Sequence, residues 1–217
     1  MPTKRNGRRK RLTKRPGTFH HGDLRRALLQ GAMLLLEREG PLGVGLRAAA
    51  RLAGVSQTAP YRHFPDKESL LAALAEEGLR ELGDKMAAAA RGHPDPRSTL
   101  FAIGETYVAF AAERPNLFRL MFGPQVADKR RCPGVEAAGH RAYQVLTDTL
   151  DAAQRAGQIR PGDIEILALT RWACVHGLAS LVVDGRLSEE VAAAGGVRPL
   201  ARKIAEQLSL SLAPEPA

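Results

Sequence analysis

Apolar side chains recur at three- and four-residue steps between residues 23 and 39, the spacing of one face of an α-helix. Gly40 and Pro41 follow, a pair that favours a left-handed stop and cannot continue the helix. The same spacing predicts a short helix over residues 46–53. Alanine and leucine dominate the chain and aromatic residues make up only 5% of it, so we expect an all-α protein rather than a β-sandwich.

A tight turn and a third helix are predicted after residue 53. Gly54 suits the turn, Val55 is expected to fill the space between the helices, and Ser56 to cap the next helix. Pro60 would then be the fourth helical residue, where it removes at most the first hydrogen bond of the helix. It therefore restricts where this helix begins without breaking its interior.

A fourth, longer helix is predicted over residues 67–90. Pro65 ends the short helix before it, and Asp66 is placed to cap the new one. The loop at residues 91–97 then separates this part of the chain from further predicted helices, over residues 98–113, 116–122, 134–156, 163–183, 189–194 and 199–210.

The segment LRAAARLAGVSQTAPYRHFPDKESLLAAL closely resembles the helix-turn-helix signature of the tetracycline-repressor-like (TetR) family, over roughly residues 19–75. The resemblance implies a three-helix DNA-binding domain, joined by a linker helix to a helical regulatory and dimerisation domain. The implied division is a basic disordered arm at residues 1–18, the helix-turn-helix domain at 19–75 and an effector-binding and dimerisation domain at 76–217.

The same resemblance assigns DNA contacts. It places three residues at base edges, Gln57, Thr58 and Ala59, and four at DNA phosphates, Arg47, Tyr61, His63 and Lys67. Glutamine can pair bidentately with adenine, threonine offers a hydroxyl and a methyl group, and alanine offers only an apolar contact. Lys67 is either a phosphate clamp or a solvated lysine. Gly45 departs from the family, which usually has a capping Ser or Thr there.

Positive charge is concentrated at the N-terminus. Eight of the 32 lysine and arginine residues lie between Lys4 and Arg15, and no acidic residue precedes Asp23. The remaining 24 basic residues nearly balance the 23 acidic ones. Such an arm cannot bury enough apolar surface to fold alone. It is a DNA-binding arm or a solubilising tail; a targeting peptide would need an apolar segment that is missing after the charges.

The segments ERPNLFRLMFG and WACVHGLASL resemble the regulatory region of one TetR subgroup, named for a Trp, a His and a Gly that here are Trp172, His176 and Gly177. Small residues at 173, 177 and 180 and an apolar stripe at 200, 204 and 208 predict a four-helix dimer interface. An intramolecular core contact is the alternative.

Large adaptable side chains of the second half could line a pocket for a small hydrophobic effector, or fill the core. They are Tyr107, Phe110, Phe118, Met121, Phe122, Tyr143, Trp172 and His176.

No constellation of catalytic residues is present, so we expect a protein that is not an enzyme and uses no cofactor. The six histidines are scattered, and His20 with His21 is better interpreted as a helix cap or phosphate contact than as a metal site.

Cys132 and Cys174 lie far apart, which fits a reducing cytoplasm. The longest stretch without charge, residues 172–183, is shorter than the roughly 20 residues of a membrane span.

These features predict a cytoplasmic, homodimeric DNA-binding transcriptional regulator, a repressor released from a double-stranded operator by a small hydrophobic effector. The alternative is a ligand-independent nucleic-acid-binding or packaging protein. The two differ in the ratio of specific to non-specific DNA binding at physiological salt.

Removal of residues 1–17 should weaken binding to many DNA sequences alike, because phosphate neutralisation carries little sequence information. The slope of log affinity against log salt should flatten by about 0.9 for each phosphate that the shortened chain no longer neutralises. Titrations of the full and shortened chains over a salt series measure both effects. An unchanged slope would identify the arm as a solubilising tail.

Overall fold

The computed structural model describes residues 21–93, 95–126 and 132–210 of the 217-residue chain. These residues form helices and no strand, which confirms the all-α prediction. In chain order the elements are α1 (His21–Gly43), α2 (Leu46–Leu52), the 3-10 helix η1 (Ala59–Arg62), α3 (Lys67–Arg91), α4 (Pro96–Glu113), α5 (Pro115–Phe122), the 3-10 helix η2 (Pro124–Val126), α6 (Pro133–Arg155), α7 (Ile164–Val183), α8 (Ser188–Ala194) and α9 (Val197–Leu210). The predicted helices after residue 97 are all found, with ends that differ by at most two residues.

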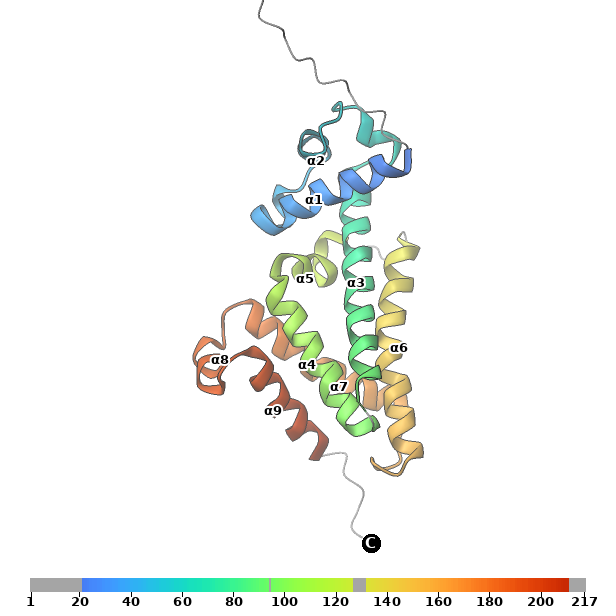
Figure 1. Cartoon of the computed structure of the whole chain (residues 1–217), viewed down its shortest axis with the longest axis vertical. Coiled ribbons are helices and arrows are strands. Elements are labelled where there is room, and N and C mark those ends of the chain that lie inside the picture. Colours follow the sequence, from blue (N-terminus) through green and yellow to red (C-terminus); the bar gives the residue numbers. More distant parts are fainter. Residues whose placement is uncertain (1–20, 94, 127–131, 211–217) are drawn as a thin grey trace, which may run out of the picture.

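Helix α3 runs through most of the length of the molecule (Figure 1). Its beginning packs near α1, α2 and η1, and its remainder lies alongside α6. Helices α4 and α9 pack together on the other side of α3 from α6 in this view, and α7 runs behind α4 and reaches α6. A single elongated helix thus belongs to both halves of the structure.

The end of α1 and the turn after α2 follow the predicted glycine chemistry. Gly40 has a φ of 72°, so the helical backbone breaks there although the helix is assigned through Gly43. Gly54 has a φ of 70°, and the amide of Val55 returns to the carbonyl oxygen of Ala50 at 3.0 Å. Positive φ is easily reached only by residues without a Cβ, so both stops depend on glycine.

The third helix begins later than predicted, and the prediction that Ser56 caps it is wrong. Its N-cap is Thr58, without a side-chain capping bond, and the hydroxyl of Ser56 instead lies 3.3 Å from that of Thr58. Pro60 therefore occupies the second position of η1, where a missing amide hydrogen breaks no helical bond. Proline thus selects a single four-residue turn in place of a longer helix.

Asp66 caps α3 as predicted. Its carboxylate accepts bonds of 2.7 Å from both the amide and the hydroxyl of Ser69, and these bonds lower the pKa of Asp66 below its usual value. Further along α3, a Cβ on the buried Gly78 would lie 2.7 Å from Met121 Sδ and 2.9 Å from Leu117 Cδ1. A side chain at this position would force the side chains of Met121 and Leu117 on α5 to shift.

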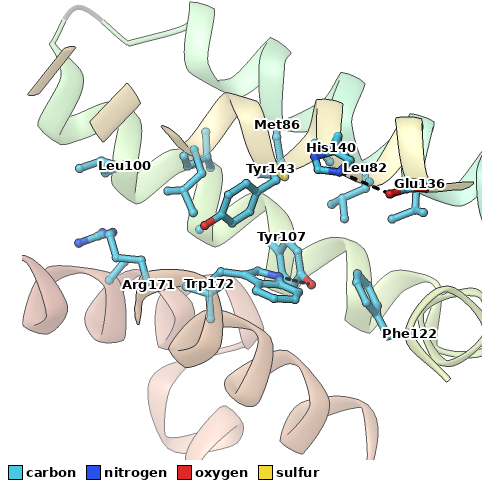
Figure 2. A pocket seen from close by; sticks show the side chains of 18 of the residues that line it. Leu82, Met86, Leu100, Tyr107, Phe122, Glu136, His140, Tyr143, Arg171 and Trp172 are labelled. Atoms are coloured by element: carbon cyan, nitrogen blue, oxygen red, sulfur yellow. Dashed lines mark hydrogen bonds and ion pairs between the residues drawn. The ribbon is translucent and has the colours of Figure 1, made fainter. Parts of the chain in front are cut away.

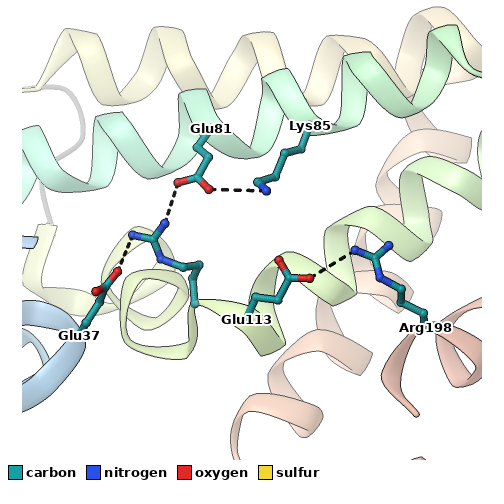
Figure 3. Close-up of polar contacts among 6 residues, drawn as sticks. Glu37, Glu81, Lys85, Glu113 and Arg198 are labelled. Carbon is teal, nitrogen blue, oxygen red and sulfur yellow. Dashed lines mark hydrogen bonds and ion pairs between the residues drawn. The ribbon is translucent and has the colours of Figure 1, made fainter. Parts of the chain in front are cut away.

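Charged side chains connect α1, α3 and α5. Arg114, directly before α5, pairs with Glu37 of α1 at 2.8 Å and with Glu81 of α3 at 2.9 Å. Figure 3 shows Glu37 and Glu81 in this network, with Lys85 on the far side of Glu81. Asn116 adds a bond of 3.0 Å from its side-chain amide to the carbonyl oxygen of Glu37. The network places α5 against the C-terminal part of α1.

Helices α7 and α9 leave apolar side chains exposed. Ile166, Leu169 and Leu181 of α7 are 60%, 51% and 46% exposed, and Ile204 of α9 is 36% exposed. Ala173 is also exposed, and open space surrounds the position of a Cβ on Gly177. By length and composition alone, α7 is the one helix of the described residues that could cross a membrane, and 17% of its most apolar window is buried.

Candidate functional site

The turn between α2 and α3 presents most of its predicted base-facing residues to solvent. Gln57 and Thr58 are exposed and Ala59 is half-buried at the start of η1. The side chains of Pro60 and Phe64 are buried and anchor the turn to the core. The guanidinium of Arg25, on α1, lies 5.4 Å from the centre of the Phe64 ring, a cation–π contact between α1 and the turn.

The predicted phosphate-contacting residues differ in their surroundings. Arg47 is exposed and Tyr61 is 48% exposed, so both are accessible to DNA. The Lys67 ammonium donates to the carbonyl oxygen of Leu42 at 3.0 Å, and this bond joins the start of α3 to the C-terminal end of α1. His63 is half-buried, and its Nε2 has no hydrogen-bond partner.

One exposed cation in this turn was not predicted. Arg62 lies in η1 between Tyr61 and His63 and is exposed. Its charge in the middle of the YRHF segment was a signal that could have identified it. The basic arm and His20 lie outside the described residues, as does the side chain of His21.

A cavity of about 320 Å³ lies within the second half of the structure, between α3, α4, α5, α6, α7 and α9 (Figure 2). This volume is at the small end of the usual range for ligand sites. Its walls are mainly aliphatic and aromatic. They include Leu79, Leu82 and Met86 from α3, Leu100, Ile103 and Tyr107 from α4, Phe122 from α5, Tyr143 and Leu146 from α6, and Trp172 and Val175 from α7.

Half of the predicted effector-binding residues line this cavity: Tyr107, Phe122, Tyr143 and Trp172. Phe118 and His176 line a second hollow, between the end of α1, α5 and α7, which Phe122 also borders. Phe110 and Met121 line neither of the two; both are buried in the core, at 1% and 0% exposure. Helical spacing could not separate these groups, because all of them lie on apolar helix faces.

A chain of polar contacts crosses the cavity wall. The indole of Trp172 donates to the Tyr107 hydroxyl at 3.4 Å, and this hydroxyl lies 2.8 Å from Nδ1 of His176. Burial raises the pKa of Tyr107 above its usual value, so the phenol stays protonated at neutral pH. Because an indole can only donate, the Tyr107 oxygen accepts from it and its hydrogen is available to His176.

Three charged or titratable residues of the cavity wall were not predicted either. Glu136 and His140 lie on α6, with His140 Nε2 4.0 Å from a Glu136 carboxylate oxygen, and both side chains are exposed. Arg171 lies on α7 and is only 5% exposed. The sequence signal for Arg171 was that it interrupts the long apolar run of α7.

Metal-ligating side chains do not gather in the described part of the chain. No group of three or more His, Cys, Asp or Glu side chains there could hold a metal ion. Of the two cysteines, Cys174 is exposed on α7 and Cys132 is half-buried directly before α6.

Solved structures of other proteins share the fold. A protein of unknown function from Rhodococcus sp. RHA1 is 34% identical, covers 92% of this chain and all of its own, and superposes with a TM-score of 0.78. The transcriptional regulator FadR from Bacillus subtilis, solved in complex with stearoyl-CoA, is 15% identical, with 85% and 97% of the two chains covered and a TM-score of 0.70.

A curated relative and two family models also match. The nucleoid occlusion factor SlmA of Marinobacter nauticus is 23% identical over 138 residues, which are 64% of this chain and 70% of the relative. The model of bacterial regulatory proteins of the tetR family matches residues 28–74, and that of the tetracyclin repressor-like C-terminal domain matches residues 100–202. With the turn between α2 and α3 in the first match and the cavity largely in the second, the chain belongs to the tetR family of bacterial regulatory proteins.

Proposed function

We propose that this protein is a dimeric transcriptional repressor that leaves its operator when a small molecule with an apolar body occupies the 320 Å³ cavity. The observation that carries this proposal is that the cavity is walled by α3, which begins directly after the turn at residues 53–66 (the proposed DNA-reading turn), and by α5, which packs on α1. The proposed domains are a DNA-binding part at residues 19–75 and an effector-binding and dimerisation part at 76–217. Such a repressor works in the cytoplasm, where its operator is.

Helix α3 supplies the first connection. Its residues Leu79, Leu82 and Met86 form part of the cavity wall, and its first residue, Lys67, directly follows the reading turn and contacts Leu42 of α1. A helix transmits a shift along its axis because its backbone hydrogen bonds resist bending. A displacement of the wall therefore moves the start of α3 and the turn docked on it.

Helix α5 supplies the second connection. Phe122 at its end borders the cavity, and Asn116 near its beginning bonds to Glu37 of α1. Arg114 pairs with the carboxylate of Glu37 as well. A ligand that moves Phe122 would thus act on α1, which supports the reading turn through Arg25 and Phe64.

The ligand changes DNA binding only by favouring one arrangement of the two reading turns over the other. A coupling free energy of about 1–3 kcal/mol corresponds to a roughly 5- to 150-fold change in operator affinity. The sign is taken from the family resemblance, in which effectors release DNA.

Filling the cavity by mutation should imitate the effector. A Cβ on Gly139, in the cavity wall, would meet only Leu79 Cδ1, at 4.0 Å, so Gly139→Phe can enter the space while Gly139→Ala leaves it almost empty. We expect the phenylalanine variant to bind the operator about 5- to 150-fold more weakly and the alanine variant to bind as the parent does. Fluorescence anisotropy with an operator selected from a random DNA library measures both.

A folded, dimeric Gly139→Phe variant with parental operator affinity would show that the cavity is not coupled to DNA binding. The protein would then fit the alternative, a ligand-independent DNA-binding protein. One relative is named a nucleoid occlusion factor and not a transcriptional regulator, which is the observation that favours testing this alternative.

DNA reading is proposed for Gln57, Thr58 and Ala59 at base edges, with Arg47, Tyr61, His63 and Lys67 at phosphates. Gln57 and Arg47 are both exposed, as side chains that contact DNA must be. A side chain at a base edge contributes to discrimination, whereas one at a phosphate contributes to binding of any sequence.

Gln57→Ala should therefore lower affinity for the selected operator by about 1–3 kcal/mol and leave non-specific affinity unchanged. Arg47→Met is the matched control: it should weaken both alike and flatten the salt slope by about 0.9. Anisotropy titrations on operator and scrambled DNA over a salt series separate the two effects. Equal losses on both DNAs for Gln57→Ala would place this residue away from the bases.

Dimerisation is proposed through α7 and α9. The exposed Ile166, Leu169 and Leu181 lie on one side of α7, together with Ala173 and Gly177. Small residues let two helices approach closely, and the large ones gain from leaving water. Two copies of this surface would bury it and place two reading turns on a two-fold symmetric operator, with half-sites about one helical turn apart.

Gly177→Glu should convert the dimer into a monomer, because it puts a charge into the proposed interface. The variant should still fold, since open space surrounds this position and glutamate favours helix over glycine. Ala137→Glu, on the exposed face of α6, is the control and should stay dimeric. Sedimentation measures the masses against the 23.4 kDa protomer. A monomeric parent, or a dimeric Gly177→Glu variant, would refute this interface.

A further inference from the structure

The cavity contains one feature that an apolar effector leaves unexplained, which is the buried cation of Arg171. This side chain is 5% exposed, and its Nη1 atom is buried without a hydrogen-bond partner. Among the described residues, no carboxylate forms an ion pair with it. Burial lowers the pKa of the guanidinium to about 10, so it remains charged at neutral pH.

An unpaired charge in an apolar interior is costly, and folded proteins normally give it a counter-ion. Replacing Arg171 by an apolar residue would therefore stabilise the fold, so the presence of the arginine indicates that an anion from outside the chain pairs with it. The wall around Arg171 is otherwise aliphatic and aromatic, with Leu100 and Leu146 among its members. A guanidinium in that setting suits a planar anion, because its fork of N–H donors matches the two oxygens of a carboxylate.

We propose that the effector is an aliphatic carboxylate whose head group pairs with Arg171 and whose hydrocarbon chain fills the rest of the cavity. This inference rests on the proposed function only for the consequence of binding, since the pairing itself concerns the cavity alone.

The charges of the cavity set the direction of the ligand. Figure 2 shows Arg171 at the same end of the view as Leu100, with Glu136 and His140 at the other end. A carboxylate is attracted to the arginine and repelled by Glu136, so the head group lies at the Arg171 end. The same view shows the Tyr143 hydroxyl directed toward the Arg171 side, where it can donate a further hydrogen bond to the anion.

The experiment is calorimetric titration of the full-length protein with saturated carboxylates of eight to fourteen carbons, and with the alcohols of equal chain length. We expect the carboxylates to bind at least tenfold more tightly than the alcohols. Affinity should rise about fourfold for each added methylene until the cavity is full. Alcohols that bind as tightly as the carboxylates, or a protein that binds neither, would overturn the proposal.

The variants Arg171→Met and Arg171→Lys test the residue itself. Methionine keeps much of the volume without charge, so carboxylate binding should fall at least tenfold while alcohol binding is retained. Lysine keeps the charge without the fork and should give an intermediate loss, which preserves the test if the methionine variant fails to fold. Parental carboxylate binding in either folded variant would mean that Arg171 has another partner, and would overturn the proposal.

Operator binding is measured in a separate titration. Carboxylate binding that depends on Arg171 but leaves operator affinity unchanged would support the ligand assignment and refute ligand control of DNA binding. If Gly139→Phe weakens operator binding but the protein binds no carboxylate, the coupling of the cavity to DNA binding is supported and the ligand assignment is refuted.

Discussion

The packing of α3 is the constraint on which the rest of the structure depends. This helix begins at the Asp66 cap beside the turn that we propose to read DNA, and ends at Arg91, between α4 and α6. It is buried along much of its length, and at Gly78 the side chains of Met121 and Leu117 on α5 pack against a position without a side chain. One rigid element therefore supplies a wall of the cavity and a support of the turn, so neither can be repositioned independently of the other.

The polar contacts around α5 orient these parts more than they stabilise them. Arg114 is partly exposed and pairs with two carboxylates, and ion pairs of this kind contribute only about 0–1 kcal/mol each. The guanidinium of Arg114 instead fixes the positions of α1, α3 and α5 relative to one another. The hydrophobic core supplies the stability, as a continuous cluster of buried residues extends from Leu28 of α1 to Ala201 of α9.

Two of the four buried side-chain polar atoms without a hydrogen-bond partner in the described residues belong to the proposed sites: Nη1 of Arg171, whose side chain lines the cavity, and Nε2 of His63 in the proposed reading turn. The other two, Nε of Arg114 and Oε1 of Gln125, lie outside these sites. The apolar surface of α7 is open to solvent in the same chain. Each costs free energy in the isolated protomer, and natural sequences tolerate such costs mainly where a partner or ligand removes them.

The sequence by itself determined the helices, the glycine stops at Gly40 and Gly54, and the cap at Asp66, because spacing and turn chemistry act over a few residues. It also carried the family resemblance that led to the reading turn. Only the tertiary structure decided that η1 starts at Ala59, since the cost of Pro60 depends on the backbone around it. It alone separated Phe122 in the cavity wall from Phe110 in the core. Helix α7 is apolar on nearly every side, so no periodicity could predict that Arg171 points inward; that depends on which helices surround it.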